Sequence, residues 1–278
     1  MSDGIRGKQL SVDFAFLDSG IGGLPYLRCL KERRPAARCV YVADTRNFPY
    51  GAKAPGDILR CASAVTERII RRWQPEAVVI ACNTISVTAL EELRRRFPET
   101  QFVGTVPAIK PAAELSKTKR IGLLATEAAA ASPYIVALKE KVAPECTLVC
   151  RGDNALVSFI ERRYLESTPE ERGRAVLPAV RFFKDAGCDA FVLGCTHFLN
   201  MTEDFRRAAG PDMAVVDSRD GVVRRALSVG GAAAPGAGGS EASTEPALYV
   251  TGFSDGSDGS LYDEFCRKMH FSFCGIFS

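Results

Sequence analysis

Short apolar runs alternate with stretches of helical periodicity along most of the chain. The apolar runs are rich in β-branched residues and bounded by polar turns, which is typical of strands in a buried parallel sheet. They comprise Val12–Leu17, Cys39–Ala43, Ala77–Ala81, Phe102–Thr105, Arg120–Ala125, Thr147–Cys150, Ala190–Leu193 and Met213–Val216. Helical periodicity covers Ile58–Trp73, Val87–Phe97, Pro133–Val142 and Pro169–Ala186, and Thr168 with Glu171 predicts a capping box. The alternation predicts an α/β fold.

Two pairs of segments repeat along the chain. Ala77–Thr84 (AVVIACNT) and Ala190–His197 (AFVLGCTH) each combine a buried strand with a small residue, a cysteine and hydrogen-bonding side chains. Phe14–Ser19 (FAFLDS) and Ile121–Glu127 (IGLLATE) each combine a strand with a polar turn that precedes a helix. The repeats predict two similar, doubly wound parallel-sheet domains, related by a pseudo-twofold axis, with the active site in the cleft between them.

Two connections mark the predicted domain boundaries. Val103–Pro107 crosses from the first domain to the second, and Asp217–Ser218 marks the return. We therefore expect a discontinuous first domain of residues 1–104 and 217–278, and a second domain of residues 105–216. The segment Gly230–Pro246 is rich in Gly, Ala, Ser and Pro and predicts an exposed loop before the last strand and helix.

Composition excludes several classes of protein. Hydrophobic residues make up 46% and charged residues 25% of 278 residues, which is ordinary globular usage. The net charge is only +3 and no basic patch stands out, so we expect no nucleic-acid partner. No apolar stretch reaches membrane-spanning length and no signal peptide is recognisable, so we expect a cytoplasmic protein whose ten cysteines are free thiols.

Cys82 and Cys195 both stand at the carboxyl end of a predicted strand, where doubly wound sheets bind their ligands. A thiol at a helix start is near unpaired backbone N–H groups, which predicts a lowered pKa and a usable base. Alone, each could simply be a small buried residue. Matched positions in a repeated motif favour a functional pair that faces one cleft.

Two opposed thiols could form a disulfide, bind a soft metal, or move protons at opposite faces of a carbon centre. No C-x-x-C motif is present, and His197 and His270 are the two histidines of the chain, so we expect no metal site. Proton transfer at a stereocentre remains, and it requires donors that stabilise a carbanionic transition state. Asn83, Thr84, Thr196 and the helix-start amides can bind a substrate carboxylate.

Two loops lie on the same predicted sheet edge. Asp18-Ser19-Gly20-Ile21-Gly22-Gly23 is neither a G-x-G-x-x-G motif nor a P-loop, and its glycines predict close approach of the backbone to a small anion. Asp18 either binds an ammonium or assists a thiol, or it caps a helix. Asn47–Gly51 (NFPYG) is a turn by composition, and we expect it to offer a phenol and a backbone N–H to the ligand.

Five motifs together resemble those of the glutamate racemases, within the cofactor-independent aspartate/glutamate racemase superfamily. They are DSGIGGL (Asp18–Leu24), PYG (Pro49–Gly51), ACNT (Ala81–Thr84), VPAIKPA (Val106–Ala112) and LGCTH (Leu193–His197), and the resemblance extends from about Phe14 to Ser218. It implies glutamate bound between two α/β domains and interconversion of its L and D forms for peptidoglycan synthesis. It also implies that neither pyridoxal phosphate nor another cofactor takes part.

The resemblance further implies a role for individual residues. Cys82 would deprotonate D-glutamate and Cys195 L-glutamate, with Asp18 and His197 assisting their respective thiols. Glu161 aligns with an acid of the family near the site, although it equally fits the solvated face of a helix. The implied substrate-binding residues are Asp18, Ser19, Pro49, Tyr50, Gly51, Asn83, Thr84, Thr126, Thr196 and His197.

Some features depart from the family pattern or vary within it. Leu199, followed by Asn200, stands where the family usually has a proline two residues after the LGCTH histidine, so we expect a slightly different helix entry. The chain after Ser218 matches the family only loosely. VPAIKPA resembles the branch that UDP-N-acetylmuramoyl-L-alanine activates, which makes this nucleotide the predicted activator. The family variation in assembly implies a monomer or a homodimer.

Two other functions stay open at this point. One is a sister racemase for aspartate or a hydantoin, against which the PYG and DSGIGGL motifs favour glutamate. The other is a regulatory protein on the same scaffold that sequesters a partner such as DNA gyrase. The intact pair of Cys82 and Cys195 argues against a purely binding role.

Overall fold

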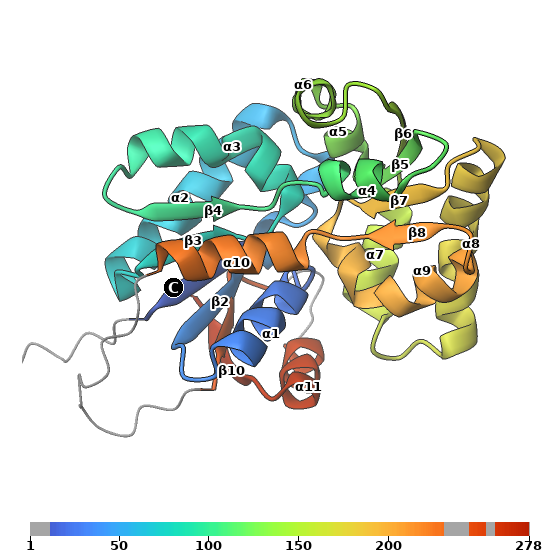
Figure 1. The fold of residues 1–278 in the computed structure, drawn as a ribbon. Coiled ribbons are helices and arrows are strands. Elements are labelled where there is room, and N and C mark those ends of the chain that lie inside the picture. The colour runs from blue at the N-terminus through green and yellow to red at the C-terminus, as the bar shows by residue number, and fades with distance from the viewer. Residues whose placement is uncertain (1–11, 231–244, 254–258, 278) are drawn as a thin grey trace, which may run out of the picture.

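The computed structural model describes residues 12–230, 245–253 and 259–277, and within them ten strands form two parallel sheets (Figure 1). The larger sheet has the order β10-β9-β2-β1-β3-β4 and the smaller sheet the order β6-β5-β7-β8. The larger sheet contains β1 (Phe14–Asp18), β2 (Cys39–Ala43), β3 (Ala77–Ile80), β4 (Gln101–Gly104), β9 (Ala247–Val250) and β10 (Ser272–Ile276). The smaller contains β5 (Arg120–Ala125), β6 (Thr147–Gly152), β7 (Ala190–Leu193) and β8 (Ala214–Val216).

Helices cover both faces of the larger sheet. Alternate residues of β1 point into different cores, since Phe14 and Phe16 belong to one cluster and Ala15 and Leu17 to another. In Figure 1, α2 and α3 lie over one face, and α1, α10 and α11 lie over the other. These helices are α1 (Leu24–Arg33), α2 (Pro55–Trp73), α3 (Asn83–Arg96), α10 (Arg219–Val229) and α11 (Ser260–Met269).

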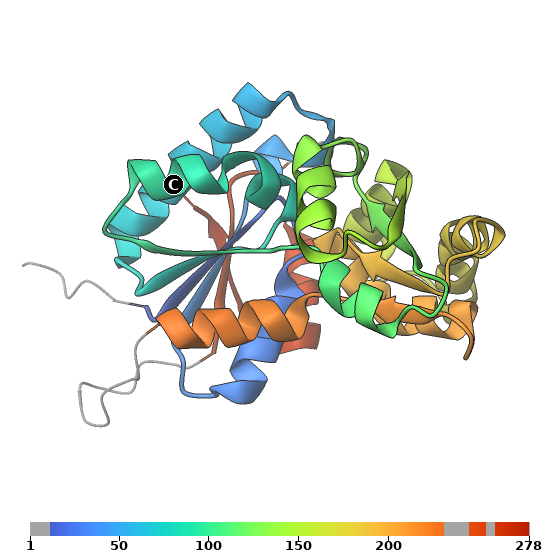
Figure 2. The ribbon, with the colours of Figure 1, turned by 45° about the horizontal axis from the view of Figure 1, so that its top comes forward.

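The smaller sheet is also covered on both faces. Ile109 and Ile135 pack on the face that carries α4 and α6, whereas Val176 and Phe205 bring α8 and α9 onto the other. The helices are α4 (Ile109–Leu115), α5 (Glu127–Ala130), α6 (Pro133–Val142), α7 (Asn154–Arg163), α8 (Pro169–Asp185) and α9 (Thr202–Ala209). Figure 2 shows the two sheets beside one another, each between its own helices. The predicted α/β architecture with two doubly wound parallel sheets is confirmed.

The strands follow the sequence pattern closely near the site. All eight predicted strands occur, and the capping box is present, with Thr168 N donating to Glu171 and Glu171 N donating to Thr168 Oγ1 at 2.8 and 3.2 Å. The end of the chain differs, because two strands, β9 and β10, flank α11 where the sequence predicts a single last strand before the helix. Both strands extend the larger sheet beyond β2.

Two connections pass between the sheets. One leads from β4 to α4 and the other from β8 to α10, and the predicted boundaries after 104 and 216 fall within them. Of the predicted loop 230–246, residues 231–244 lie outside the described residues. In the part of the chain that the structure describes, no helix combines the length and apolar character needed to cross a membrane.

Candidate active site

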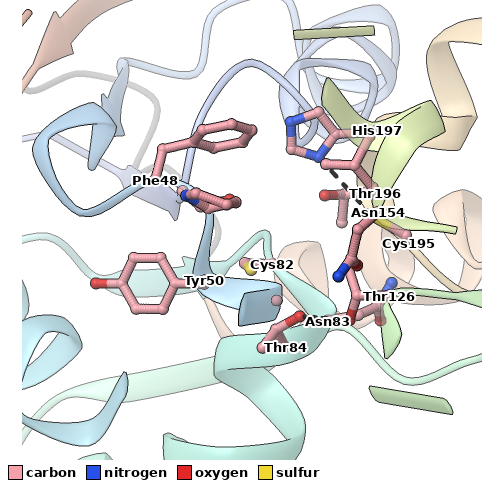
Figure 3. A pocket seen from close by; sticks show the side chains of 14 residues that line it. Phe48, Tyr50, Cys82, Asn83, Thr84, Thr126, Asn154, Cys195, Thr196 and His197 are labelled. Carbon is pink, nitrogen blue, oxygen red and sulfur yellow. Dashed lines mark hydrogen bonds between the residues drawn. The ribbon is translucent and has the colours of Figure 1, made fainter. Parts of the chain in front are cut away.

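A pocket lies where the carboxyl ends of strands from both sheets meet (Figure 3). Its lining is Ser19, Phe48, Pro49, Tyr50, Gly51, Cys82, Asn83, Thr84, Thr126, Asn154, Val157, Cys195, Thr196 and His197. The structure therefore brings together every predicted site residue except Asp18 and Glu161, which lie immediately behind the lining.

The two cysteines occupy matched positions. Cys82 follows β3 and precedes α3, whereas Cys195 follows β7 and precedes η3 (Thr196–Met201), a short 3-10 helix that contains Leu199–Asn200. Their backbones have nearly the same conformation, with φ/ψ of −133/119° and −128/138°. Each is 5% exposed. The repeated motif thus places two similar buried thiols at one pocket.

Cys195, His197 and Glu161 form a hydrogen-bonded chain of side chains, the Cys195 arm. The Cys195 Sγ lies 3.8 Å from His197 Nδ1, and His197 Nε2 lies 2.8 Å from Glu161 Oε2. Glu161 is 4% exposed, so the alternative that it lies on a solvated helix face is wrong. Burial opposes a charge on His197, but the hydrogen bonds with Cys195 and Glu161 outweigh it and raise the pKa of the imidazole well above its usual value.

Cys82 has different surroundings. The predicted lowering of its pKa at the helix start is wrong for this thiol: burial, followed by the charge of Asp18, raises the pKa of Cys82 well above its usual value. Hydrogen bonds from the Ile85 amide and the Ser19 side chain oppose this increase without reversing it. Desolvation in the protein outweighs the partial charge of the helix start, so Cys82 retains its proton.

Asp18 lies behind Cys82 and is fully buried. Its Oδ1 accepts the Ser19 amide at 2.6 Å, and its Oδ2 is 3.2 Å from the Tyr41 hydroxyl and 3.3 Å from Thr196 Oγ1. Helix α1 begins at Leu24 with Gly23 as its N-cap, so the helix-cap alternative for Asp18 is wrong. Burial, the largest effect, raises the pKa of the Asp18 carboxyl.

The glycine-rich loop after β1 packs against the Cys195 arm. A Cβ atom on Gly20 would stand 2.3 Å from Glu161 Oε2, and one on Gly22 would stand 2.4 Å from His197 Nδ1. The Ile21 amide donates to Glu161 Oε2 at 2.9 Å. The glycines of this loop therefore permit close packing against the protein's own Glu161 and His197 side chains, whereas the expected approach to a small anion stays a prediction.

Polar side chains complete the pocket wall. The side-chain amide of Asn83 is buried, with 3% of the residue exposed, and neither its oxygen nor its nitrogen has a hydrogen-bond partner among the described residues. Thr84 and Thr126 face each other with 3.1 Å between their hydroxyl oxygens. An unpartnered buried amide is destabilising, so Asn83 is poised for a polar ligand.

Tyr50 lines the pocket differently from the prediction. Its hydroxyl donates to Asp44 Oδ2 at 2.5 Å and points away from both cysteines in Figure 3. Asp44 also accepts from the Asn47 amide at 3.0 Å and from Thr251 Oγ1 at 2.6 Å. The phenol that we expected to donate to the ligand therefore donates to Asp44 instead, and the Tyr50 ring forms part of the pocket wall. Pro49 and Gly51 also line the pocket.

Sequence reasoning missed several residues of the site. The Phe48 ring packs on His197 with 5.8 Å between ring centroids, and Asn154 and Val157 line the pocket from α7. Only one residue separates Asn154 from the end of strand β6, so the strand-end rule could have found it. Tyr41 and Tyr262, which contact Asp18 and Glu161, had no local signal because these contacts join distant segments.

The donor set does not resemble a metal centre. In residues 12–230, 245–253 and 259–277, no group of three or more His, Cys, Asp or Glu side chains is arranged to hold a metal ion. The pairs around the pocket are instead thiol with imidazole, imidazole with carboxylate, and carboxylate with hydroxyl. Such groups can accept, hold and return protons.

Comparison with known proteins identifies relatives of this site and fold. Residues 26–226 match the family model described as Asp/Glu/Hydantoin racemase. The chain is 39% identical over 263 residues to the glutamate racemase of Treponema pallidum strain Nichols, covering 95% of this chain and 96% of the relative. It is 40% identical over 213 residues to that of Granulibacter bethesdensis, covering 76% of each.

A solved structure is similar over nearly the whole chain. It is Escherichia coli glutamate racemase in complex with L-glutamate and the activator UDP-MurNAc-Ala, with a TM-score of 0.83 and 27% identity over 96% of this chain and 98% of that one. The likeness to the two curated relatives and the matched family model lead to the same assignment. The chain belongs to the Asp/Glu/hydantoin racemase family.

Proposed function

We propose that the protein interconverts L- and D-glutamate, using Cys82 and Cys195 as the two bases and no cofactor. The observation that carries this proposal is the pair of buried thiols with matching backbone geometry at one pocket. Two bases on opposite sides of a carbon centre can invert it without any group having to move across the site. The resulting D-glutamate would serve peptidoglycan synthesis.

Each direction of the reaction requires one thiol to be protonated and the other to be a thiolate. Cys82 keeps its proton and can act as an acid, whereas Cys195 lies beside His197, which can hold the thiol proton as an imidazolium paired with Glu161. From L-glutamate, the Cys195 thiolate takes the α-proton while the Cys82 thiol donates its own to the opposite face. In the reverse reaction the Cys82 thiolate takes the α-proton of D-glutamate while the Cys195 thiol donates its own proton to the opposite face. Asp18, a buried carboxyl with a raised pKa beside Cys82, can hold the proton that the Cys82 thiol gives up.

Binding of the substrate stabilises the charge that develops at its α-carbon. Asn83 has an unpartnered amide in the pocket, and Thr84, Thr126 and the α3 start add further donors beside it. Hydrogen bonds to the substrate carboxylate delocalise the negative charge, and a buried pocket makes each of them stronger than in water. Asn83 would thus gain the partners that the protein itself does not provide.

A direct test is to incubate the purified protein with L-glutamate or D-glutamate, without added cofactor, and to follow circular dichroism. The proposal predicts that both samples converge on zero ellipticity, with aspartate and hydantoins converted far more slowly. Faster conversion of aspartate would assign the chain to a sister racemase. A protein that inverts none of these substrates would contradict the racemase proposal and favour a binding role on this scaffold.

We further propose that UDP-N-acetylmuramoyl-L-alanine, the activator held by the Escherichia coli relative, activates this enzyme. Val106 of the VPAIKPA segment lines two cavities at the connections between the sheets, and Arg225 lines both of them. Arg94 borders one cavity and Arg224 the other, so cationic groups are available for a diphosphate. Adding the nucleotide should raise the racemisation rate, and Arg225→Ala should weaken this activation. A rate independent of the nucleotide would contradict it.

A further inference from the structure

Tyr262 lies on α11, outside the residues 26–226 that match the family model. The side chain is buried, and its ring stacks on Phe273 with 6.3 Å between centroids. Its hydroxyl donates to Glu161 Oε1 at 3.3 Å. Burial and the neighbouring Glu161 charge raise the pKa of Tyr262, so the phenol keeps the proton that it donates.

The Glu161 carboxylate has three donors, which come from three separate segments of the chain. Oε2 accepts from the Ile21 amide at 2.9 Å and faces His197 Nε2 at 2.8 Å, whereas Oε1 accepts from Tyr262. Each oxygen is therefore held by a different set of partners. A carboxylate fixed at both oxygens cannot rotate freely, and this rotation would otherwise alter the hydrogen bond to His197.

The alternative partners for Oε1 are limited. Gly20 closes against the carboxylate, since a Cβ there would stand 2.5 Å from Oε1. Glu161 itself is almost fully buried, so solvent cannot readily replace the Tyr262 hydroxyl. Losing this donor would leave a buried carboxylate oxygen without its partner, which is strongly unfavourable for a charged acceptor.

We propose that Tyr262 is a positioning residue that acts through Glu161 and His197 on the Cys195 thiol, and not on the Cys82 thiol. This inference rests on the proposed two-cysteine racemase. Tyr262 does not face the pocket, so its effect reaches the substrate through the Cys195 arm alone. Its loss should therefore slow proton transfer at one thiol of the pair.

The test compares Tyr262→Phe with Tyr164→Phe. Phenylalanine keeps the ring of Tyr262 against Phe273 and removes only the hydroxyl. Tyr164 is a matched control because it directly follows α7, the helix of Glu161, and its ring packs on Phe265 of α11. We expect kcat for L-glutamate to fall about tenfold in Tyr262→Phe with little change in KM, and to stay near wild type in Tyr164→Phe.

Isotope effects distinguish a positioning role from a general loss of structure. Glutamate carrying deuterium at the α-carbon reports how far each thiol's proton abstraction limits kcat/KM. In Tyr262→Phe, the effect with the L-isomer should rise and that with the D-isomer should fall, because the Cys195 step becomes the slower one. Equal changes for both isomers, or wild-type kinetics, would overturn the proposal.

A second readout needs no turnover. The chain has two histidines, and His270 is exposed, so the nitrogen NMR signals of His197 can be followed against an internal reference. Tyr262→Phe should shift the His197 Nε2 signal, whereas Tyr164→Phe should leave it unchanged. An unshifted signal would overturn the role of Tyr262 even in an active racemase. A wild-type protein that inverts no glutamate would instead refute the proposed function.

Discussion

The Cys82 and Cys195 sides of the pocket share a backbone and differ in their partners. Both thiols follow a buried strand with nearly the same φ and ψ and the same small exposure. Cys82 has a buried carboxyl behind it, and its own pKa is raised. Cys195 contacts an imidazole whose far nitrogen meets a buried carboxylate.

The repeated motif sets the positions of the two thiols, whereas contacts that are not repeated set their protonation states. Two identical thiolates facing each other would repel, and two identical thiols could not begin the reaction. A side that favours the thiol and a side that places an imidazole beside its thiol can supply an acid and a base for the same reaction. The two predicted halves are therefore similar in strand geometry and different in chemistry.

Removing either thiol should have the largest effect. Cys82→Ser and Cys195→Ser should each reduce racemisation by about 10²- to 10⁴-fold, because a serine hydroxyl is a much weaker acid and its oxygen a poor proton acceptor near neutral pH. Circular dichroism with glutamate measures the rate. Cys188→Ser is the matched control, since Cys188 is another buried free cysteine outside the pocket. Full activity in either pocket variant would refute the pairing of the thiols.

The second-largest loss of activity should come from adding a side chain to the glycine loop that packs against the Cys195 arm. Gly20→Ala places a Cβ within 2.3 Å of Glu161 Oε2, which displaces the carboxylate from His197. A displacement of this size should lower kcat by about 10²-fold. Gly173→Ala lies in α8 with nothing within 4 Å and should keep full activity. Equal activity in the two variants would show that the Glu161 position is unimportant.

Replacing Asp18, on the Cys82 side of the pocket, should change how the stability of the protein depends on pH. Since the folded-state pKa of Asp18 is raised, the folded protein binds this proton more tightly than the unfolded chain does. Wild-type stability should therefore fall, through this group, as pH rises from about 4 through the raised pKa. Asp18→Asn lacks this titrating carboxyl, so its free energy of unfolding relative to wild type should increase over the same pH range, as denaturant unfolding would measure. A difference that is constant with pH would contradict the raised pKa.

Removing the Ser19 hydroxyl should have the smallest effect on this side. Ser19 lowers the pKa of Cys82 against the larger influence of burial, so Ser19→Ala should raise that pKa further. We expect kcat with D-glutamate to fall about 2- to 10-fold and its pH profile to move to higher pH. Measuring kcat against pH for both isomers tests this, and an unmoved profile for D-glutamate would show that Ser19 does not influence Cys82.

The sequence predicts the features that depend on local pattern. Strands such as Ala77–Ile80 and Ala190–Leu193 are recognisable as apolar runs, and the residues after them fall at the ligand edge of each sheet. The partners of these residues depend on packing between distant segments. The approach of Gly20 to Glu161 spans 141 residues of sequence, and the Tyr262 contact spans 101. No local signal could reveal either one.

The pKa of Cys82 also depends on packing that the sequence does not reveal. The helix start after it is visible in the sequence and favours a thiolate. The depth of its burial and the nearness of Asp18 are properties of the folded chain, and they dominate. Likewise, the NFPYG motif shows that Tyr50 stands near the site, whereas the direction of its hydroxyl depends on the buried Asp44 carboxylate.

The most direct test of the two-base account is the position of deuterium during the reaction in D2O. At low conversion from L-glutamate, the product D-glutamate should carry deuterium at the α-carbon while the recovered L-glutamate keeps hydrogen. The same pattern should hold from the D-isomer, because the thiol that donates is never the one that abstracts. Deuterium appearing equally in recovered substrate and product would contradict the two opposed thiols and point to a single base.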